Sequence, residues 1–235
     1  MREADANPDV SPDANPDVEN LAEAFNVSRE TIDQLRVYQS LLEKWQNSIN
    51  LVGPATLRQF WTRHVADSAQ LASLASPLAR KWVDLGSGGG FPGLVISLMW
   101  AGRPALDGGV VHLIESDGRK CEFLKTVIRE TGAPAKVHEG RIEEMCQKNP
   151  ETFGGVDVIS ARALAPLDKL LLMSASYFDI HTIGLFMKGR GWQEELTACE
   201  VSWNMGLEVV PSKTDQEAKI LVCRQPELRQ SGYAG

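Results

Sequence analysis

A glycine-rich segment that directly follows a short apolar run carries the strongest chemical signal in the sequence. The run Trp82–Leu85 contains Asp84 and leads into Gly86–Gly90, which Phe91–Gly93 follows. Glycines adopt positive φ angles and let a ligand approach the main chain closely. A proline such as the one in Phe91–Gly93 suits the first turn of a helix. The pattern therefore predicts a strand, a ligand-binding loop and a helix in succession.

Three interpretations of this segment stay open on the residues alone. One is a glycine-rich turn without a ligand. The second is a dinucleotide site, because Gly88–Gly93 matches G-x-G-x-x-G, although the glycine that directly follows the strand is Gly86. The third is an S-adenosylmethionine site, because Asp84–Gly88 matches Asp/Glu-x-Gly-x-Gly in register. It makes Asp84, Gly86, Ser87 and Gly88 candidate cofactor contacts, with Asp84 expected to meet the ammonium group of the ligand.

A second acidic residue is expected beside this loop. Glu115 ends the apolar run Val110–Ile114, at the position where a ribose lies in nucleotide-binding sheets. A carboxylate that accepts both ribose hydroxyls gains charge-assisted hydrogen bonds of ~1.5–3 kcal/mol each. Dehydrogenases use an acid at the same position. Glu115 therefore indicates that a nucleoside binds, but it does not distinguish a dinucleotide from S-adenosylmethionine. The alternative is a surface glutamate without a ligand.

Short apolar runs alternate with helical stretches in the part of the chain that must position these residues. The predicted strands are Trp82–Leu85, Val110–Ile114, Lys136–His138, Val156–Ser160, Ile183–Met187, Glu208–Val210 and Ile220–Cys223. The predicted helices are Pro92–Trp100, Arg119–Thr131, Pro166–Ser176 and Trp192–Met205. The alternation predicts an α/β fold, with a mostly parallel sheet covered on both faces. The last two strands have only a loop between them, which predicts an antiparallel hairpin at the sheet edge.

The part of the chain before the sheet is expected to be helical, after a polar tail. Asp5–Val10 returns as Asp13–Val18, and this acidic, proline-broken repeat predicts disorder. Ser28 is a candidate cap for a helix with apolar residues at helical spacing up to Ile49. A second helix is expected after Thr56. The expected units are a disordered acidic tail at 1–19, a helical extension at 20–78, the α/β domain at 79–226 and a flexible end at 227–235.

Composition limits the class of protein. The chain has 235 residues, of which 43% are hydrophobic and 23% charged, as in an ordinary folded domain. The four cysteines are scattered, so neither a disulfide framework nor a metal site is expected and a reducing cytoplasm fits. No apolar run is long enough for a membrane span. The net charge is −7, but residues 1–30 hold eight acids and two bases. The remainder is nearly neutral, which leaves room for a local basic face that binds nucleic acid.

A set of ordered motifs makes the sequence resemble the RsmG/GidB family, the bacterial 16S rRNA guanine-N7 methyltransferases. The resemblance runs from about Leu41 to the last predicted strand. The motifs that carry it are Ile49–Val52, Arg63–Ser68, Asp84–Gly93, Glu115–Lys120, Gly140–Glu143, Ser160–Ala163 and Met187–Gly189. Their order and spacing together are specific, although each motif is short.

The resemblance implies a class I S-adenosylmethionine-dependent methyltransferase, Rossmann-like with a seven-stranded sheet, plus an N-terminal helical extension. It implies transfer of a methyl group from S-adenosyl-L-methionine to N7 of one guanine in the 530 loop of 16S rRNA, in the cytoplasm. The partner is then the small ribosomal subunit or an assembly intermediate of it. The cofactor contacts of the family correspond here to Gly86, Phe91, Ile142, Glu143 and Arg162, and Glu115 joins them by its position in the fold.

Guanine N7 has a free lone pair and carries no proton, so its methylation needs no general base. Arg162 is expected to orient the guanine, because a guanidinium donates to O6 in the plane of the base. A structural ion pair is the alternative role for Arg162. His64 and Asp67 lie three residues apart on a predicted helix and are expected to hold the extension over the cofactor.

Five basic residues are the candidate RNA contacts. Lys188 and Arg190 follow the fifth predicted strand, and Arg63, Arg119 and Lys120 extend the face, although each can also be an ordinary solvated charge. No membrane partner is expected. Two alternative functions stay open: a methyltransferase of the same fold that acts on a small molecule or protein, and a non-catalytic cofactor-binding factor of ribosome assembly.

Overall fold

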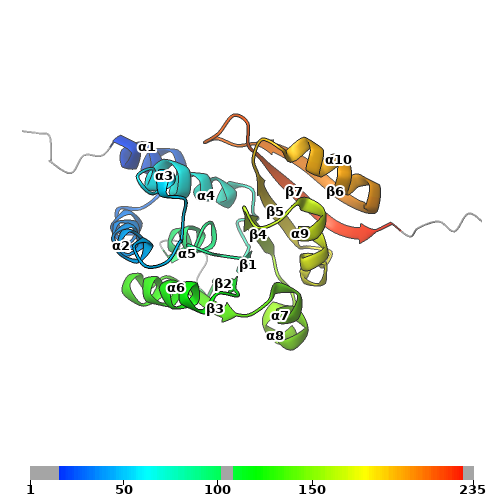
Figure 1. Ribbon diagram of the computed structural model, residues 1–235, viewed down its shortest axis with the longest axis horizontal. Coiled ribbons are helices and arrows are strands. Elements are labelled where there is room, and N and C mark those ends of the chain that lie inside the picture. The colour runs from blue at the N-terminus through cyan, green and yellow to red at the C-terminus, as the bar shows by residue number, and fades with distance from the viewer. Residues whose placement is uncertain (1–15, 102–107, 230–235) are drawn as a thin grey trace, which may run out of the picture.

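The computed structural model describes residues 16–101 and 108–229. A seven-stranded sheet in the order β3-β2-β1-β4-β5-β7-β6 forms its centre (Figure 1). The strands are β1 (Lys81–Leu85), β2 (Val110–Glu115), β3 (Ala135–Glu139), β4 (Val158–Arg162), β5 (Ile183–Lys188), β6 (Trp203–Pro211) and β7 (Lys219–Leu228). Strands β1 to β5 run parallel, and β7 is antiparallel to both β5 and β6. The predicted α/β fold with an antiparallel edge hairpin is confirmed.

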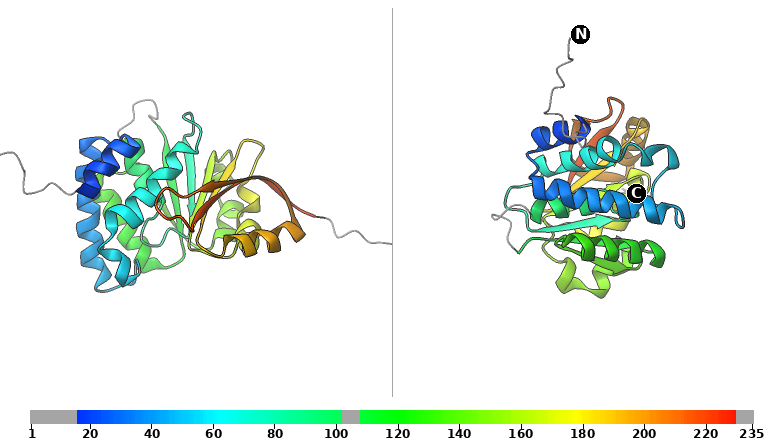
Figure 2. Two further views of the ribbon diagram at one scale, coloured as in Figure 1. Left: turned by 90° about the horizontal axis from the view of Figure 1, so that it is seen from above. Right: turned by 90° about the vertical axis from the view of Figure 1, so that its left-hand side faces the viewer.

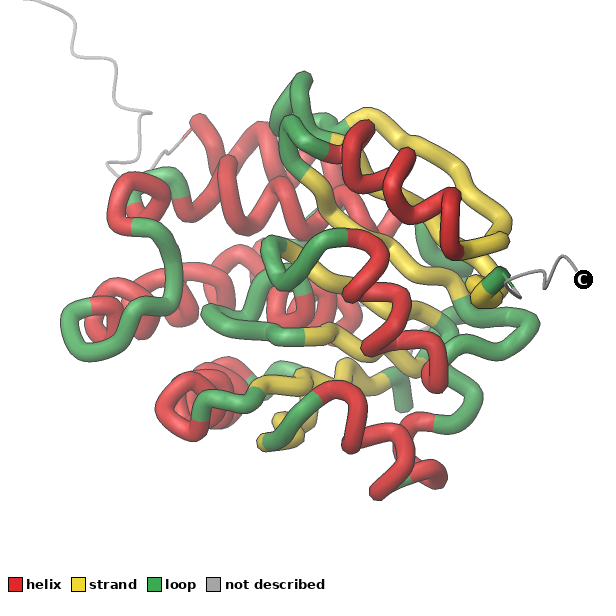
Figure 3. Tube along the Cα trace, turned by 45° about the vertical axis from the view of Figure 1, so that its right-hand side comes forward, coloured by secondary structure: helices red, strands yellow, loops and turns green. Residues whose placement is uncertain are grey.

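Helices cover both faces of this sheet (Figure 3). The helical extension comprises α1 (Pro16–Phe25), α2 (Arg29–Gln46), α3 (Pro54–Leu57), the π-helical turn η1 (Phe60–Ala66), α4 (Asp67–Ala69) and the 3-10 turn η2 (Gln70–Ser73). The helices that alternate with the strands are α5 (Gly93–Ala101), α6 (Gly118–Thr131), α7 (Ile142–Lys148), α8 (Pro150–Phe153), α9 (Leu167–Ser174), the 3-10 turn η4 (Ala175–Tyr177) and α10 (Trp192–Ser202). Helices α5 and α6 share one core with the extension, and α7, α9 and α10 share a second core on the opposite face.

The hydrophobic pattern explains how the extension attaches to the sheet domain. On α2, Leu35, Tyr38 and Leu42 lie at helical spacing and are fully buried. Ser28 caps this helix by accepting a hydrogen bond from the backbone N–H of Thr31, as predicted. The buried stripe packs against α5 and α6, which places α2 as an outer layer of the molecule (Figure 2).

Several boundaries differ from those predicted. Helix α1 begins at Pro16, inside the stretch expected to be disordered, while residues 1–15 lie outside the described part. The single helix predicted after Thr56 is divided into α3, η1, α4 and η2. Strand β6 begins at Trp203, because alternate residues from there on face the core and solvent, whereas the prediction continued the helix to Met205. Strand β7 continues to Leu228, past the expected domain limit.

The short helices α7 and α8 were not predicted. Helix α7 buries only Ile142 and Met145, and α8 buries only Phe153, so the repeat is too short to show a helical period in the sequence. Among residues 16–101 and 108–229, no helix combines the length and apolarity that crossing a membrane requires.

Two histidines on neighbouring strands form a hydrogen-bonded pair that makes stability depend on pH. His112 of β2 and His138 of β3 lie 2.8 Å apart, Nδ1 to Nε2, and both rings pack against Phe153. Burial lowers the pKa of His112 to about 4 and lowers that of His138. As the pH falls, the histidines of the unfolded chain therefore bind protons at a higher pH than those of the folded chain. The stability that the pair contributes above pH 6.5 is lost as the pH falls toward 4.

We expect the free energy of unfolding to fall between pH 7 and pH 5, with the pair contributing on the order of 1 kcal/mol of that fall. Urea unfolding at both pH values measures it. The variant His138→Gln keeps a hydrogen-bonding side chain but does not titrate, so it should lose less stability over the same interval. Equal losses in the variant and the wild type would contradict this account.

Candidate functional site

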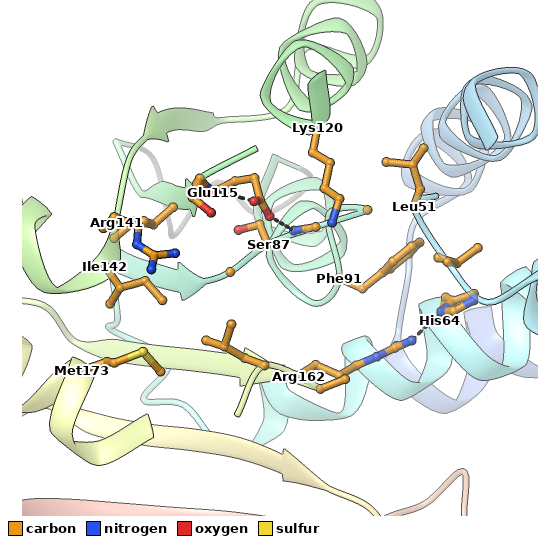
Figure 4. A pocket seen from close by; sticks show the side chains of 18 of the residues that line it. Leu51, His64, Ser87, Phe91, Glu115, Lys120, Arg141, Ile142, Arg162 and Met173 are labelled. Carbon is orange, nitrogen blue, oxygen red and sulfur yellow. Dashed lines mark hydrogen bonds between the residues drawn. The ribbon is translucent and has the colours of Figure 1, made fainter. Parts of the chain in front are cut away.

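A cavity of about 540 Å³ opens at the carboxyl ends of the central strands. Strand β1 lies between β2 and β4, so the chain connections diverge on its two sides, and open parallel sheets bind ligands at this point. The cavity walls come from the loop after β1, the ends of β2 and β4, the start of α7 and the segment Leu51–Gly53 of the extension (Figure 4). The structure thus brings the predicted loop, the predicted acid and the extension to one place.

The loop after β1 has the conformation that its glycines allow. Gly86 has a φ of 65°, and a Cβ there would lie 2.5 Å from Cδ1 of Leu164, a neighbouring residue of the cavity lining. Gly93 lets α5 begin against β1, because its Cβ would lie 2.8 Å from Asp84 Oδ2. The loop is tied to β2 by Ser87 N–H, which donates to the Ile114 carbonyl at 3.0 Å. Gly86, Ser87, Gly88 and Phe91, four of the predicted cofactor contacts, all line the cavity.

Asp84 lies below the loop and does not line the cavity. Its fully buried carboxylate accepts hydrogen bonds from Ser160 Oγ at 2.6 Å and from Gly93 N–H at 3.3 Å. Trp82 Nε1 donates to Ser160 Oγ at 2.8 Å and completes the network. Burial raises the pKa of Asp84 to about 6, although Ser160 partly offsets this effect. Asp84 therefore supports the loop, and the expected contact with a ligand ammonium finds no counterpart in this geometry.

Glu115 lies at the end of β2 with its carboxylate in the cavity wall, as expected (Figure 4). Oε1 accepts from the N–H groups of Ser116 and Asp117, both at 2.8 Å. Oε2 accepts from Gly88 N–H at 2.8 Å. A carboxylate oxygen accepts two hydrogen bonds, so Oε2 retains capacity for a hydroxyl. Glu115 is 7% exposed, which shields such a bond from water.

Arg162 ends β4 and forms one wall of the cavity together with the extension. One terminal nitrogen donates to the Arg63 carbonyl at 3.1 Å and to Asp67 Oδ2 at 3.3 Å. The other nitrogen donates to His64 Nδ1 at 2.6 Å (Figure 4). The guanidinium also lies 5.5 Å from the centre of the Phe91 ring. Four contacts from η1, α4 and the loop thus hold the orientation of Arg162.

The partners of His64 determine its protonation state. Arg162 can only donate, so Nδ1 accepts and Nε2 carries the proton, which it donates to Thr56 Oγ1 at 3.1 Å. The Thr56 hydroxyl in turn donates to the Gly53 carbonyl at 2.9 Å. Burial and the positive charges of Arg162 and Arg63 lower the pKa of His64 to about 3. The ring is therefore neutral and positions Arg162, in agreement with the expected locking role.

Aromatic side chains of the extension pack against Phe91 in the loop after β1. Phe91 stacks between His64, at 4.6 Å, and Tyr38, at 5.2 Å between ring centres. The Tyr38 hydroxyl donates to the Gly89 carbonyl. No motif in the sequence assigned Tyr38 to the site, because its position in the apolar stripe of α2 predicts burial but does not show which loop it contacts.

The start of α7 forms the apolar side of the cavity. Ile142 and Glu143 line it, as expected from the family motif. Arg141, which belongs to the same motif but was not a predicted contact, also lines it. So does Met173 of α9, to which no motif in the sequence pointed (Figure 4). No group of three or more histidine, cysteine, aspartate or glutamate side chains suited to a metal ion occurs within the described ranges 16–101 and 108–229.

The five predicted RNA contacts are dispersed. Arg63 and Arg190 are exposed and pair with acids of the β6–β7 loop, at 2.9 Å to Asp215 and 2.6 Å to Glu217. Arg119 is exposed and donates to the Ser48 carbonyl at 2.7 Å. Lys120 points into the cavity at the carboxyl ends of the central strands, beside Glu115 (Figure 4).

Lys188 differs most from the expectation of a phosphate contact. Its side chain is 7% exposed, and its ammonium group donates to the Ala165 carbonyl at 2.6 Å and pairs with Glu195 at 2.8 Å. Ala165 precedes β5 in the sequence and Glu195 follows it, so the local pattern of a lysine before a glycine did not reveal these partners.

Comparisons with known proteins agree with this geometry. The profile of the GidB family, described as rRNA small subunit methyltransferase G, matches residues 31–221. A protein of Parvibaculum lavamentivorans named ribosomal RNA small subunit methyltransferase G is 51% identical over 206 residues, which cover 88% of each chain. A protein of the same name from Paramagnetospirillum magneticum is 47% identical and covers 88% of this chain and 95% of its own.

Solved structures show the same fold. An O-methyltransferase from Streptomyces achromogenes, TomG, in complex with SAM has a TM-score of 0.53 at 12% identity, over 81% of this chain and 89% of its own. A mutant of MtNAS in complex with S-adenosylmethionine has a TM-score of 0.52 at 19% identity, over 88% and 83% of the two chains.

Proposed function

Because this chain belongs to the rRNA small subunit methyltransferase G family, we propose that it transfers a methyl group from S-adenosyl-L-methionine to N7 of a guanine in the 530 loop of 16S rRNA. One observation carries the proposal: a single cavity has the glycine loop and Glu115 at one end and the fixed guanidinium of Arg162 at the other. The first end suits a nucleoside, and the second suits the acceptor edge of a guanine.

The residues of the cavity fit the cofactor. The free acceptor capacity of Glu115 Oε2 suits a ribose hydroxyl, and the Gly86–Gly88 main chain allows a close approach. Ile142 and Met173 offer apolar surface to the adenine, with Glu143 at the rim. When bound, S-adenosyl-L-methionine supplies an electrophilic methyl group.

The chain's own residues then act by positioning. Guanine N7 needs no deprotonation, and the geometry agrees, because the histidine nearest the site is neutral and already engaged as an acceptor of Arg162. Arg162 is held in one orientation and can donate to O6 of the base. Proximity and orientation alone lower a barrier by ~7–11 kcal/mol.

For the RNA backbone we propose contacts from the exposed residues Arg63, Arg119 and Arg190, because their partners are surface groups that a phosphate can replace. Lys188 is buried against Ala165 and is assigned to the stability of the sheet end.

The test is mass spectrometry of rRNA from a strain that lacks this protein. We expect the loss of one 7-methylguanosine from 16S rRNA, restored when the gene is returned. An unchanged rRNA profile would overturn the proposal and favour a small-molecule or protein substrate, or a non-catalytic assembly factor. Calorimetry with S-adenosylmethionine on the purified protein shows, in parallel, whether the cavity takes the cofactor.

A further inference from the structure

A second cavity, of about 260 Å³, adjoins the first across Arg162. Thr56, His64, Arg162 and Ala163 line both cavities, so they form a common wall. Ala163 has a φ of 52°, which is uncommon for a residue with a side chain and marks a backbone held by its surroundings. Two adjoining cavities with one shared arginine suggest two ligands that meet there.

Three separate parts of the chain build the second cavity. Asp67 and Gln70 come from the extension, Met187 from the end of β5, and Ser212 and Asp215 from the loop between β6 and β7. This loop reaches back to the extension, as both views of Figure 2 show. Gln70 anchors it, because the Lys213 N–H donates to Gln70 Oε1 at 2.9 Å. This hydrogen bond holds the β6–β7 loop against the extension, so two of the walls of the second cavity are fixed relative to each other.

The two carboxylates that line the second cavity, Asp67 and Asp215, differ in how readily they can exchange their present partners for a ligand. Asp67 accepts from Arg162 at 3.3 Å, from Thr214 Oγ1 at 2.6 Å and from Gln70 Nε2 at 3.0 Å, so its partners are all internal. Asp215 pairs with Arg63 at 2.9 Å, and the two side chains are 34% and 47% exposed. An exposed ion pair contributes little stability, so Arg63 can leave Asp215 at small cost. Arg63 lowers the pKa of Asp215, and so does the Glu217 N–H, which donates to Oδ1 at 3.0 Å. The second bond does not depend on Arg63, so the carboxylate stays an ionised acceptor when Arg63 leaves.

The donors and acceptors of the second cavity are arranged in an order that matches guanine. Guanine has acceptors, O6 and N7, on one edge, and its N2 amino group is a donor on the other side of the base. The wall shared with the first cavity holds the donor Arg162, whereas Asp215 lines the second cavity and not the first. Other donors in the second lining already have partners within the protein: Arg63, Gln70, Lys188 and Lys219. Met187, which is partly exposed, offers apolar surface to the face of a base. Adenine presents a donor, N6, where guanine has O6, and would meet Arg162 unfavourably.

We propose that the second cavity receives the target guanine and that Asp215 recognises it by accepting hydrogen bonds from its N1–H and N2 amino groups. This inference rests on the proposed function and names the specificity-determining residue of the same site. Asp215 exchanges Arg63 for the base, and the released Arg63 becomes available to a phosphate of the RNA.

The test compares guanine with inosine, which lacks the N2 amino group, at the target position of a ligated 16S rRNA. For the wild type we expect kcat/KM to be about 10-fold higher with guanine. Asp215→Asn should lower kcat/KM on guanine by about 10- to 100-fold and reduce the guanine preference to about 1, because an amide offers a donor as well as an acceptor. Affinity for S-adenosylmethionine, measured by calorimetry, should stay unchanged.

Glu217→Gln is the matched control, because Glu217 is in the same loop, pairs with the exposed Arg190 and does not line the cavity. It should keep the wild-type rate and the guanine preference. An active wild type with the same guanine preference in Asp215→Asn would overturn this inference alone. A wild type that binds S-adenosylmethionine but methylates no rRNA would overturn the proposed function and this inference with it.

Discussion

Replacement of Gly86 by aspartate is expected to abolish the binding of S-adenosylmethionine while the protein stays folded. The new Cβ would lie 2.5 Å from Leu164 Cδ1, and both Gly86 and Leu164 line the first cavity, so the new side chain is placed at the cavity surface. Leu164 meets it with the end of a flexible side chain that can move, so the core is not disturbed. The added carboxylate then occupies ligand space. We expect the affinity measured by calorimetry to fall by about 100-fold or more, which corresponds to at least about 2.8 kcal/mol.

The control for backbone strain is Gly132→Asp. Gly132 has a φ of 69°, close to the 65° of Gly86, but a Cβ there meets nothing within 4 Å, and the residue ends α6 away from the cavity. Both variants should lose a similar, small amount of stability, on the order of 1 kcal/mol. Only Gly86→Asp should lose cofactor affinity. Normal affinity in a folded Gly86→Asp protein would show that the cofactor does not lie on this loop.

The position of the first cavity could be predicted from the sequence because its determinants are local. An apolar run followed by glycines specifies a strand and a loop, and Glu115 ends the next run. In a parallel sheet, neighbouring strand ends lie together, so loop and acid had to meet. The roles of Asp84 and Lys188 could not be predicted, because their partners Ser160 and Glu195 are brought to them by the fold.

The extension shows a different limit of sequence patterns. Helical spacing indicated that Tyr38 is buried, and it is. It did not indicate the π-helical turn η1, which turns His64 toward Arg162. Periodicity reports that a side chain faces the interior, whereas its interior partner depends on tertiary packing. The wall shared by the two cavities is therefore a property of the fold that no single motif contains.

Replacement of Arg162 by lysine is expected to remove most of the methyl-transfer activity, although the positive charge is kept. The guanidinium reaches His64, Asp67 and the Arg63 carbonyl with two nitrogens of a planar group. A lysine ammonium is a single point on a flexible stem and cannot hold these acceptors and also present a fixed donor to the base. A displacement of about 1 Å at a reacting group costs about 100-fold in rate. We expect a loss of that size in the single-turnover rate of methylation of the small ribosomal subunit.

Two measurements separate this positioning role of Arg162 from simple damage to the fold. Arg129→Lys makes the same chemical change at an exposed ion pair, Arg129 with Glu130, and should leave the rate unchanged. Binding of S-adenosylmethionine to Arg162→Lys should weaken far less than the rate falls, because the glycine loop and Glu115 are intact. If the two quantities fell together, Arg162 would act on the cofactor rather than on the acceptor base. Because Arg162 belongs to both cavities, the ratio of these losses measures directly which of the two ligands it serves.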